Sequence, residues 1–427
     1  QNENNTARTT QVVAERPWKN ATDWLSYDHH ECDWFSQPSL PTDITGFIDY
    51  EVYIDSFIQQ ATMDDHDDYP CQRLSSDSSN NCDHTLEFDG SFKHLRLYHN
   101  NLQGSLPLEL SLLTSLETLD VPENQLTGPV LTILATLPKT LVSVKLGGNV
   151  GLEGTLPTEL GLLQQLTILS VYGCSFSGSI PTELVQLTLL EELKLDSNGF
   201  SGQIPSQLSA LSNLEQAFLW ANYLTGTIPP SLGELPAVEF YMDGNLITGV
   251  IPSELGLLAS SAEFFYLNNN LLEGSIPSEL GLLSNVLRMD LYNSLLNGSI
   301  PSELGQLSIT TTDLYLDDNQ LTGSIPSQLG RLSEAFSITL FSNLLTGSLP
   351  TELGTLTNLN GLYLYDNLLT GTLPSLWRFP DAFHDLRISG NYLSGSLPSE
   401  VGLWSNLVIL LVDNNDLTGT VPLELDS

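Results

Sequence analysis

Leucines recur along this chain in a fixed pattern of apolar and polar positions, from Leu95 to Gly419. The repeating phrase is about 24 residues long and is clearest from Leu362 to Pro374, where it reads L-x-L-x-x-N-x-L-x-G-x-(I/L)-P. The L-x-L portion alternates between two faces, which is typical of a short strand whose leucines enter a core. One such phrase cannot bury its leucines alone, so we expect consecutive copies to stack around a continuous core.

An asparagine marks the same position in most copies of the phrase. A buried amide at this position can bond to backbone groups left open by a turn, so we expect a ladder of asparagines along the stack. Two copies carry Cys174 and Ser294 instead, and the spacing stays at 23 to 25 residues, so no large domain interrupts the stack. The asparagines are Asn100, Asn124, Asn149, Asn198, Asn222, Asn245, Asn270, Asn319, Asn343, Asn367, Asn391 and Asn415.

Each copy also predicts a second extended segment. Its glycine, for example Gly202, Gly226 or Gly323, permits a tight bend. The Ile-Pro or Leu-Pro that follows ends the segment, because proline cannot donate to a ladder of strands. The second copy reads Gly128-Pro129-Val130 where Gly-x-Ile-Pro is expected, which weakens the prediction of a second strand there.

The Gly-x-Ile-Pro-x-x-Leu-Gly stretch resembles the plant-type subclass of leucine-rich repeats. Residues 321–330 and 369–374 match it almost letter for letter, and the resemblance covers roughly residues 93–427. The predicted fold class is an α/β solenoid, a right-handed leucine-rich-repeat superhelix of about 14 repeats. The resemblance implies a concave parallel β-sheet, a second short β-sheet and a convex side of 3-10 turns and loops.

A capping region is predicted before the repeats. A Trp-Leu pair followed by Cys32 and Trp34 is similar to the N-terminal cap of extracellular plant-type and algal repeat proteins. A long insertion separates Cys32 from Cys71 and Cys82. In such caps the second cysteine lies shortly before the first repeat strand, so the resemblance favours a Cys32–Cys82 disulfide, with Cys71–Cys82 as the alternative.

The division that follows is a capping region with an acidic insertion at residues 1–93 and a solenoid at residues 94–427. The chain carries 51 acidic and 13 basic residues, a formal charge of −38. So acidic a surface argues against nucleic acid and against anionic membranes as partners, since both attract lysine and arginine. Many of the acids come from the Pro-x-Glu-Leu phrase, which we expect on the outer side of the coil.

An extracellular setting is expected, either secreted or at the cell surface. The sequence has no run of 18 apolar residues and begins at Gln1 without a signal peptide, as a processed chain would. The sequons at Asn4, Asn20 and Asn297 are the predicted glycosylation sites. The chain stops inside a repeat without a cysteine cap, so either the native polypeptide continues, for example to a membrane anchor, or the final turn ends at Asp426.

The outward strand positions are the candidate binding surface. Aromatic residues gather there in the middle repeats, and they offer large contact area with little entropy loss. The alternative is that aromatics are good strand formers that pack sideways on one another. The candidate ligand-binding residues are Phe218, Trp220, Tyr241, Phe264, Tyr266, Tyr292, Tyr315, Phe341, Tyr363 and Tyr365, together with Arg288.

Several basic residues also take outward strand positions. We predict that they pair with acids on neighbouring strands, such as Asp120, Glu192, Asp290 and Asp385. An anionic ligand group would find its only strong partners at these bases. They are Arg96, Lys145, Lys194, Arg288 and Arg387.

Metal and catalytic chemistry are not expected. The acidic run at residues 63–68 lacks the spaced ligands of a calcium loop, and the His-His-Glu-Cys run at residues 29–32 lacks a second ligand pair for zinc. The sequence holds no Gly-x-Ser-x-Gly, phosphate-binding glycine loop or His-Glu-x-x-His. We therefore predict no enzyme, no cofactor and no metal.

Two function classes are compatible with these observations. The first is an extracellular binding module that recognises a peptide, glycan or protein on its concave aromatic face, a role implied by resemblance to plant receptor kinases, receptor-like proteins and polygalacturonase inhibitors. A co-receptor or self-association would be a further partner in that case. The second is a structural or adhesive protein of a wall or matrix, which would act through its acidic outer surface.

Overall fold

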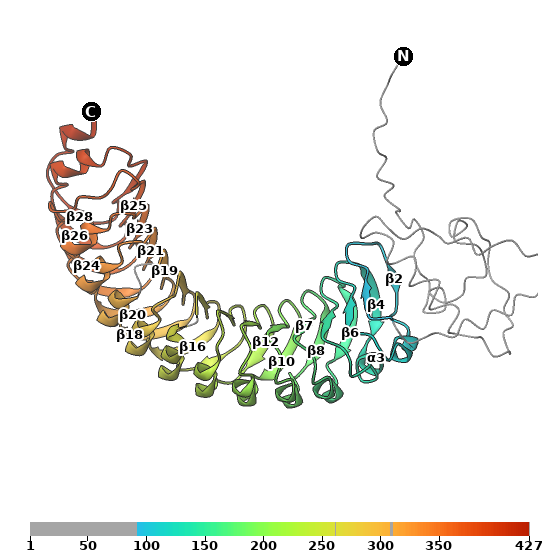
Figure 1. The fold of residues 1–427 in the computed structure, drawn as a ribbon. Coiled ribbons are helices and arrows are strands. Elements are labelled where there is room, and N and C mark those ends of the chain that lie inside the picture. Colours follow the sequence, from blue (N-terminus) through green and yellow to red (C-terminus); the bar gives the residue numbers. More distant parts are fainter. Residues whose placement is uncertain (1–91, 261, 308–310, 427) are drawn as a thin grey trace, which may run out of the picture. The chain divides into compact units, whose positions relative to one another are not determined.

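The computed structural model describes residues 92–260, 262–307 and 311–426 (Figure 1). The predicted cap, with its three cysteines, two of its sequons and its acidic run, lies outside the described residues. The described chain forms two compact units, residues 92–177 and residues 178–426. No helix in the described residues has both the length and the apolar character that crossing a bilayer requires.

A parallel main sheet runs through each unit, with one three-residue strand from each repeat. Equivalent positions of successive repeats lie side by side, so that Tyr241 pairs with Tyr266 and Leu314 with Ile338. In the first unit the strands are β1 (His94–Arg96), β3 (Thr118–Asp120), β5 (Ser143–Lys145) and β7 (Ile168–Ser170). In the second unit they are β9 (Glu192–Lys194), β11 (Gln216–Phe218), β13 (Glu239–Tyr241), β15 (Phe264–Tyr266), β17 (Arg288–Asp290), β19 (Asp313–Tyr315), β21 (Ser337–Thr339), β23 (Gly361–Tyr363), β25 (Asp385–Arg387) and β27 (Ile409–Leu411).

The second extended segment also forms strands, and these pair in parallel with their neighbours, except that β12 does not pair with β14. In the first unit they are β2 (Gln103–Gly104), β4 (Gln125–Pro129), β6 (Gly151–Thr155) and β8 (Ser175–Gly178), whose last residue opens the second unit. In the second unit they are β10 (Gly199–Gln203), β12 (Tyr223–Thr225), β14 (Thr248–Gly249), β16 (Leu271–Ser275), β18 (Leu295–Ser299), β20 (Gln320–Ser324), β22 (Leu344–Gly347), β24 (Leu368–Gly371), β26 (Tyr392–Gly395) and β28 (Asp416–Leu417).

Strand β4 corrects one expectation from the sequence. Its Gly-Pro-Val ending does not prevent a second strand, because Thr127 pairs with Gly151 and Pro129 with Glu153. A proline at the last residue of a strand costs little, since the ladder ends there. The short α-helix α3 (Leu131–Leu134) follows this strand, where most other repeats have a 3-10 helix.

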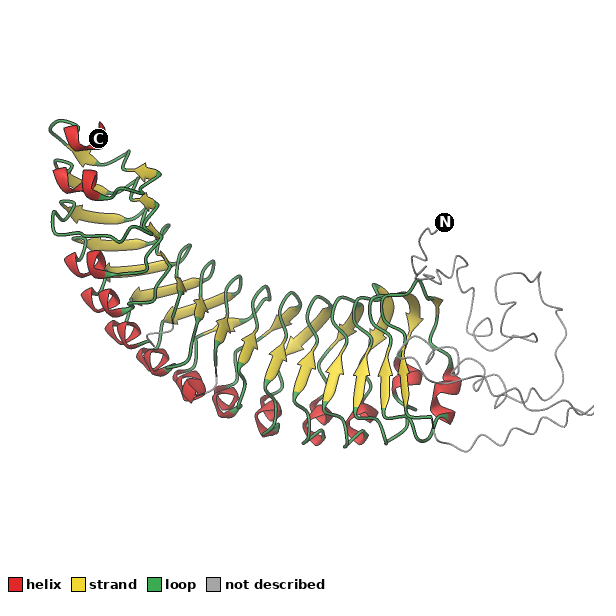
Figure 2. Ribbon diagram, turned by 45° about the horizontal axis from the view of Figure 1, so that its top comes forward, coloured by secondary structure: helices red, strands yellow, loops and turns green. Residues whose placement is uncertain are grey.

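Short 3-10 helices complete most repeats and appear as the red coils of Figure 2. The preceding proline fixes an extended backbone, and its carbonyl accepts the first helical bond, as in Leu280 N to Pro277 O at 3.2 Å. The helices are η1 (Leu108–Leu112), η2 (Thr158–Leu162), η3 (Thr182–Gln186), η4 (Ser206–Ala210), η5 (Pro230–Glu234), η6 (Ser253–Ser260), η7 (Ser278–Leu282), η8 (Ser302–Gln306), η9 (Ser327–Arg331), η10 (Thr351–Thr355), η11 (Ser399–Leu403) and η12 (Leu423–Asp426).

The core of each unit is the stack of consensus leucines, most of which are fully buried. Each such side chain stabilises the fold by about 1.5–3 kcal/mol through burial. Phenylalanine replaces leucine at a few of these positions, and Phe240 and Phe265 pack in neighbouring repeats with centroids 6.0 Å apart. Buried positions alternate along each strand with outward ones, as the L-x-L pattern predicts.

The asparagine ladder forms as predicted. Asn222 shows its chemistry: its amide oxygen accepts from Phe200 N at 3.0 Å, and its amide nitrogen donates to Leu195 O at 3.0 Å and to Leu219 O at 3.2 Å. Cys174 and Ser294, which replace the asparagine in two repeats, make different contacts from it. The Cys174 thiol donates to Leu146 O at 3.5 Å, and burial raises its pKa to about 12. Among the described residues, Ser294 Oγ is buried without a partner, because its side chain is too short for the ladder.

The glycine after the second leucine is required by the backbone. Gly226 has a φ of +77°, which favours glycine. A Cβ there would lie 2.8 Å from Gln203 Cγ of the preceding repeat, so the close approach of the second strands also excludes a side chain.

Candidate functional site

The candidate site is the open face of the second unit. We define the open face as the outward side chains of the main-sheet strands and of the residue two positions after each strand. In β11 the pattern is clear, because Ala217 and Leu219 are buried in the core while Phe218 and Trp220 are half-buried on the other side. All ten aromatic residues predicted for this surface, and Arg288, are half-buried there.

Three of these rings form a continuous stack across neighbouring strands. Phe218 stacks on Tyr241 with centroids 4.6 Å apart, and Tyr241 stacks on Tyr266 with centroids 4.7 Å apart. Phe264 meets the stack with its edge, 6.3 Å from Tyr241 and 6.1 Å from Tyr266. Offset stacking of this kind stabilises by about 0.5–1.5 kcal/mol per pair beyond burial. We call Phe218, Tyr241, Phe264 and Tyr266 the aromatic stack.

Basic side chains close both ends of the aromatic stack. The Lys194 ammonium lies 4.9 Å from the Phe218 ring centroid. At the other end the Arg288 guanidinium lies between two rings, 5.3 Å from Tyr266 and 4.7 Å from Tyr315. Such cation–π contacts orient the guanidinium as well as stabilise it.

A second, smaller group lies on later strands of the same face. Phe341 stacks on Tyr365 with centroids 4.3 Å apart, and the Arg387 guanidinium lies 5.4 Å from the Tyr363 ring. In the part of the chain that the structure describes, no ring stacking involves Trp220 or Tyr292. In the described residues their half-buried rings therefore do not stack against another aromatic ring.

The basic residues of the open face pair with the predicted acids, but not across strands as expected. Arg288 makes a bidentate contact with Asp290, with Nε to Oδ1 at 2.9 Å and Nη2 to Oδ2 at 2.8 Å. Arg387 does the same with Asp385, and Lys194 lies 3.1 Å from Glu192. In each pair the partners stand two positions apart on one strand, because alternation places both on the same face.

Two basic residues of the first unit have a weaker relation to their predicted partner. Lys145 and Arg96 lower the pKa of Asp120 electrostatically, but burial outweighs them and raises it. Among the described residues no ion pair joins either of them to an acid. The prediction that these bases pair with acids is therefore confirmed for the second unit. The prediction that the pairs form across strands is wrong.

Carboxylates with little exposure also belong to the open face, where Asp196, Asp290 and Asp317 are buried and Asp243 is half-buried. Burial raises the pKa of Asp196, Asp243 and Asp317 to about 6 in each case. Asp290 is 3% exposed, and burial raises its pKa in spite of the opposing Arg288 guanidinium. Burial also raises the pKa of tyrosines on the open face, and it brings the pKa of Tyr315 to about 12. The open face therefore has more negative charge than its bases can neutralise.

Asn268 belongs to this face and was missed from the sequence. The candidate residues for its repeat were Phe264 and Tyr266, which flank the first core position, whereas the residue after Leu267 is also outward. Asn268 is 4% exposed, and its Oδ1 is buried with no hydrogen-bond partner in the described chain. Writing the outward positions of every repeat in register would have found it, since it stands beside Asp243 and Tyr292.

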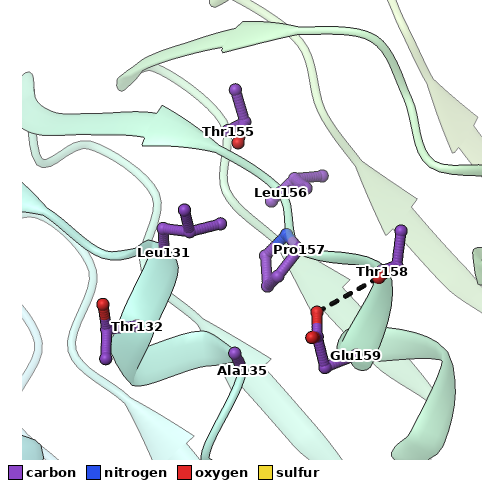
Figure 3. Close-up of a pocket in the computed structure, with 8 residues that line it drawn as sticks. All are labelled: Leu131, Thr132, Ala135, Thr155, Leu156, Pro157, Thr158 and Glu159. Atoms are coloured by element: carbon purple, nitrogen blue, oxygen red, sulfur yellow. Dashed lines mark hydrogen bonds between the residues drawn. The ribbon is translucent and has the colours of Figure 1, made fainter.

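The remaining candidate features, a metal site, a pocket and a sequon, give weaker support for a functional site than the open face does. Within the described ranges no three His, Cys, Asp or Glu side chains gather in a way that could hold a metal ion. A shallow pocket in the first unit lies between α3 and the turn at Pro157, and Glu159 at its rim accepts from Thr158 at 3.1 Å (Figure 3). Its lining is mainly leucine, threonine and proline, without converging charged groups. The sequon residue Asn297 is exposed on β18.

Comparison with known proteins agrees with the fold. The sequence model described as Leucine Rich Repeat matches residues 165–187, 189–211 and 310–332. Among the curated proteins none matches the chain.

Solved structures resemble the chain over most of its length. One is described as a TDR receptor, with 31% identity, a TM-score of 0.72, and coverage of 79% of this chain and 58% of that one. A second is PEPR1 with AtPEP1, with 29% identity, a TM-score of 0.69, and coverage of 78% and 50%. A third is a leucine-rich-repeat protein of Leptospira interrogans, with 28% identity, a TM-score of 0.60, and coverage of 77% and 86%. The chain thus spans only half to three-fifths of the first two relatives.

These comparisons agree with the repeat phrase, the paired sheets and the asparagine ladder. The Gly-x-Ile-Pro second strand, which the plant-type repeat predicts, is present in both units. The chain is a leucine-rich-repeat protein of the plant type.

Proposed function

We propose that this chain is an extracellular binding module that recognises a peptide on the open face of its second unit. The observation that carries the proposal is the group of half-buried aromatic side chains on that face, which Lys194 and Arg288 hold at both ends of the aromatic stack. Rings fixed in this way lose little further entropy when a ligand covers them.

The similar proteins support a peptide as the ligand. One of them is described as the complex of PEPR1 with AtPEP1, and another as a plant peptide hormone receptor, RGFR1, in complex with RGF2. The RGFR1 structure has 27% identity, a TM-score of 0.57, and coverage of 79% of this chain and 69% of that one. An extended peptide would contact one or two outward positions per repeat as it crosses successive strands about 4.8 Å apart.

The test is a binding screen of the purified full chain against a displayed peptide library, followed by titration of the selected peptide. Substituting Trp220, Tyr266 and Tyr315 by alanine together removes three rings of the open face. We expect the dissociation constant to rise by about 10,000-fold, because truncating aromatic contact residues typically costs about 2 kcal/mol each.

A matched control separates recognition from general loss of aromatic surface. Tyr223 and Tyr392 lie on the second strands β12 and β26 and are 61% and 56% exposed. The Tyr223→Ala/Tyr392→Ala variant should bind with unchanged affinity. A screen that selects no peptide, or peptides whose affinity ignores the open-face triple variant, would refute the proposal.

The extracellular location, glycosylation at Asn297 and the cap disulfide are parts of the same proposal. The exposure of Asn297 supports attachment of a glycan there, and a single mass difference after enzymatic deglycosylation of the secreted chain would report it. The Cys32–Cys82 pairing and the division at residue 93 remain predictions. We propose no catalytic activity for this chain.

A structural or adhesive role is the second candidate. The exposed glutamates Glu159, Glu279 and Glu352 of the Pro-x-Glu-Leu phrase favour it, because they repeat along the outer side of the stack. Association with calcium or wall polymers that is lost when these glutamates become glutamine, and that ignores the open-face aromatics, would favour this role instead.

A further inference from the structure

Three polar side chains lie together beside the aromatic stack, and among the described residues no cation neutralises their negative charge. Its members are Asp243, Asn268 and Tyr292, which take the same outward position in three consecutive repeats. The backbone fixes this order, since Gly244 N donates to Asn268 O at 3.1 Å and Asn269 N donates to Tyr292 O at 3.0 Å. We call these three residues the polar triad.

Asn268 shows what the polar triad lacks. Its side chain follows the buried Leu267 and therefore points to the open face, between Asp243 and Tyr292. Its amide oxygen is sealed from solvent and receives no hydrogen bond from the described chain. A buried acceptor without a donor destabilises the folded state, because it has lost its hydrogen bonds to water. A ligand that places an N–H donor at this oxygen would recover that loss.

Asp243 adds a charge that no neighbouring cation neutralises. Arg288, the nearest basic residue that acts on it, is bound to Asp290 through two nitrogens and held between two tyrosine rings. In the described residues Asp243 makes no ion pair. Its pKa is raised because burial penalises the carboxylate and because Asp290 and Asp196 add negative charge nearby.

The rings of Tyr241, Tyr266 and Tyr292 complete the surroundings. Each feels the Asp243 carboxylate electrostatically, and burial raises the pKa of each. Aromatic faces attract cations and repel anions, and they exclude water from the carboxylate. A carboxylate, an orphan acceptor and aromatic walls together select a group that is cationic, rich in N–H donors and flat or slender.

We propose that the polar triad is a subsite for the ammonium or guanidinium group of a basic side chain, a lysine or arginine of the bound peptide. This inference rests on the proposed peptide-binding function and adds the chemistry of one ligand residue to it. The cation would donate to the Asp243 carboxylate and would lie against the tyrosine rings, and a turn of the Asn268 amide would bring Oδ1 to the surface to accept from the same cation. The excess of acids over bases on the open face favours the approach of such a ligand.

The charge balance of the open face supports a cationic ligand. Its bases are Lys194, Arg288 and Arg387, and each is already paired with an acid. Its acids are Glu192, Asp196, Glu239, Asp243, Asp290, Asp313, Asp317, Asp385 and Asp413.

The experiment uses calorimetric titration of the full chain with three small probes. N-acetyl-arginine amide and N-acetyl-lysine amide carry the proposed groups, and N-acetyl-norleucine amide has the lysine chain without its charge. Two variants test the triad, Asp243→Asn and Asn268→Leu, both of which keep side-chain volume. We expect at least one basic probe to bind the unaltered chain and to lose about tenfold or more in affinity with either variant, because hydrogen bonds to charged groups are strong.

The control variant is Asp413→Asn. Asp413 takes the same outward position in the last repeat, where it is exposed and accepts from Ser389 and Asn414, and no ring of the aromatic stack lies beside it. It should bind the basic probes as the unaltered chain does. Misfolding does not confuse the result, because removing the half-buried charge of Asp243 or the orphan acceptor of Asn268 is expected to raise the melting temperature.

Four outcomes would overturn the proposal. The first is that neither basic probe binds, and the second is that N-acetyl-norleucine amide binds equally well. The third is that Asp413→Asn loses as much affinity as the two triad variants. The fourth is that calcium chloride, and not the basic probes, gives heat of binding that depends on Asp243. The proposed function can fail separately. A selected peptide that needs the open-face aromatics but ignores Asp243→Asn would refute the subsite alone, whereas basic probes that bind through Asp243 without any selected peptide would refute the peptide-binding function alone.

Discussion

The two units share one scaffold and differ in what they place on its outward positions. In the first unit the outward positions are mostly small or charged. Of the two tyrosines there, Tyr98 is 56% exposed, and Tyr172 is held by a 2.6 Å hydrogen bond to Glu123 while its ring lies over Gly147. In the second unit the same positions carry stacked rings, bound guanidinium groups and buried carboxylates. Because the leucines and asparagines are the same in both, stability and recognition are encoded at separate positions of each repeat.

The largest expected effect concerns the scaffold and should be equal in the two units. Asn149 and Asn343 each accept one backbone N–H and donate to three carbonyls, at distances between 2.7 and 3.5 Å. Substituting either by alanine leaves these buried groups unpaired and should lower the free energy of unfolding by about 3 kcal/mol. Urea denaturation followed by circular dichroism measures it. A large effect at one position and none at the other would break the claim of a common scaffold.

The next effect should appear in one unit only. Trp220→Ala on the open face should weaken a selected peptide by about 30-fold, whereas Tyr98→Ala in the first unit should leave its affinity unchanged. Tyr98 is 56% exposed, so its substitution does not disturb the core. Titration of both variants measures the difference. Equal losses would show that recognition is not confined to the second unit.

The smallest effect concerns the buried carboxylates. Asp317 has a pKa of about 6 against an ordinary value of 3.8, because burial penalises its charge more than the Thr339 hydroxyl stabilises it. The folded state therefore holds a proton that the unfolded state releases. Its contribution to stability is present at low pH and is lost as the pH rises through about 6. Asp317→Asn should remove this loss and raise the melting temperature at pH 7 by about 2–4 °C.

Comparing the melting temperatures at two pH values separates the effect of Asp317 from the effect of the overall charge of −38. At about pH 3, below the ordinary value of 3.8, the Asp317→Asn variant and the unaltered chain should melt at the same temperature, because Asp317 is then protonated in both the folded and the unfolded state. Asp120→Asn in the first unit tests the same principle at a carboxylate whose pKa burial also raises. A variant less stable than the unaltered chain at pH 7 would contradict the direction.

Much of the fold follows from the repeat phrase. The spacing of Leu314, Leu316 and Asn319 predicts strand, core and ladder, because each residue acts on its equivalents one repeat away. The same phrase indicated that outward aromatics such as Tyr241 and Tyr266 emerge side by side. Where the phrase is broken, at Gly128-Pro129, the neighbouring repeat still pairs with the strand, so the sequence of one repeat was a poor guide.

The site was less predictable, because it depends on contacts that the phrase does not specify. Alternation places Arg288 and Asp290 on one face, but only side-chain conformation decides that they pair with each other and not with a neighbouring strand. The raised pKa of Asp243 depends in part on the charges of Asp290 and Asp196, which belong to other repeats. The repeat spacing correctly assigned Asn270 to the ladder, but the orphan oxygen of Asn268 is a packing result that the spacing did not indicate.

Oxidative footprinting of the full chain, with and without a selected peptide and read by mass spectrometry, locates the bound ligand. We expect protection of Trp220, Tyr266 and Tyr292 on the open face, and unchanged oxidation of Tyr98, Tyr223 and Tyr392. Protection of Tyr223 and Tyr392 with no change at Trp220 would contradict this expectation, because the ligand would then lie on the second strands and not on the main sheet.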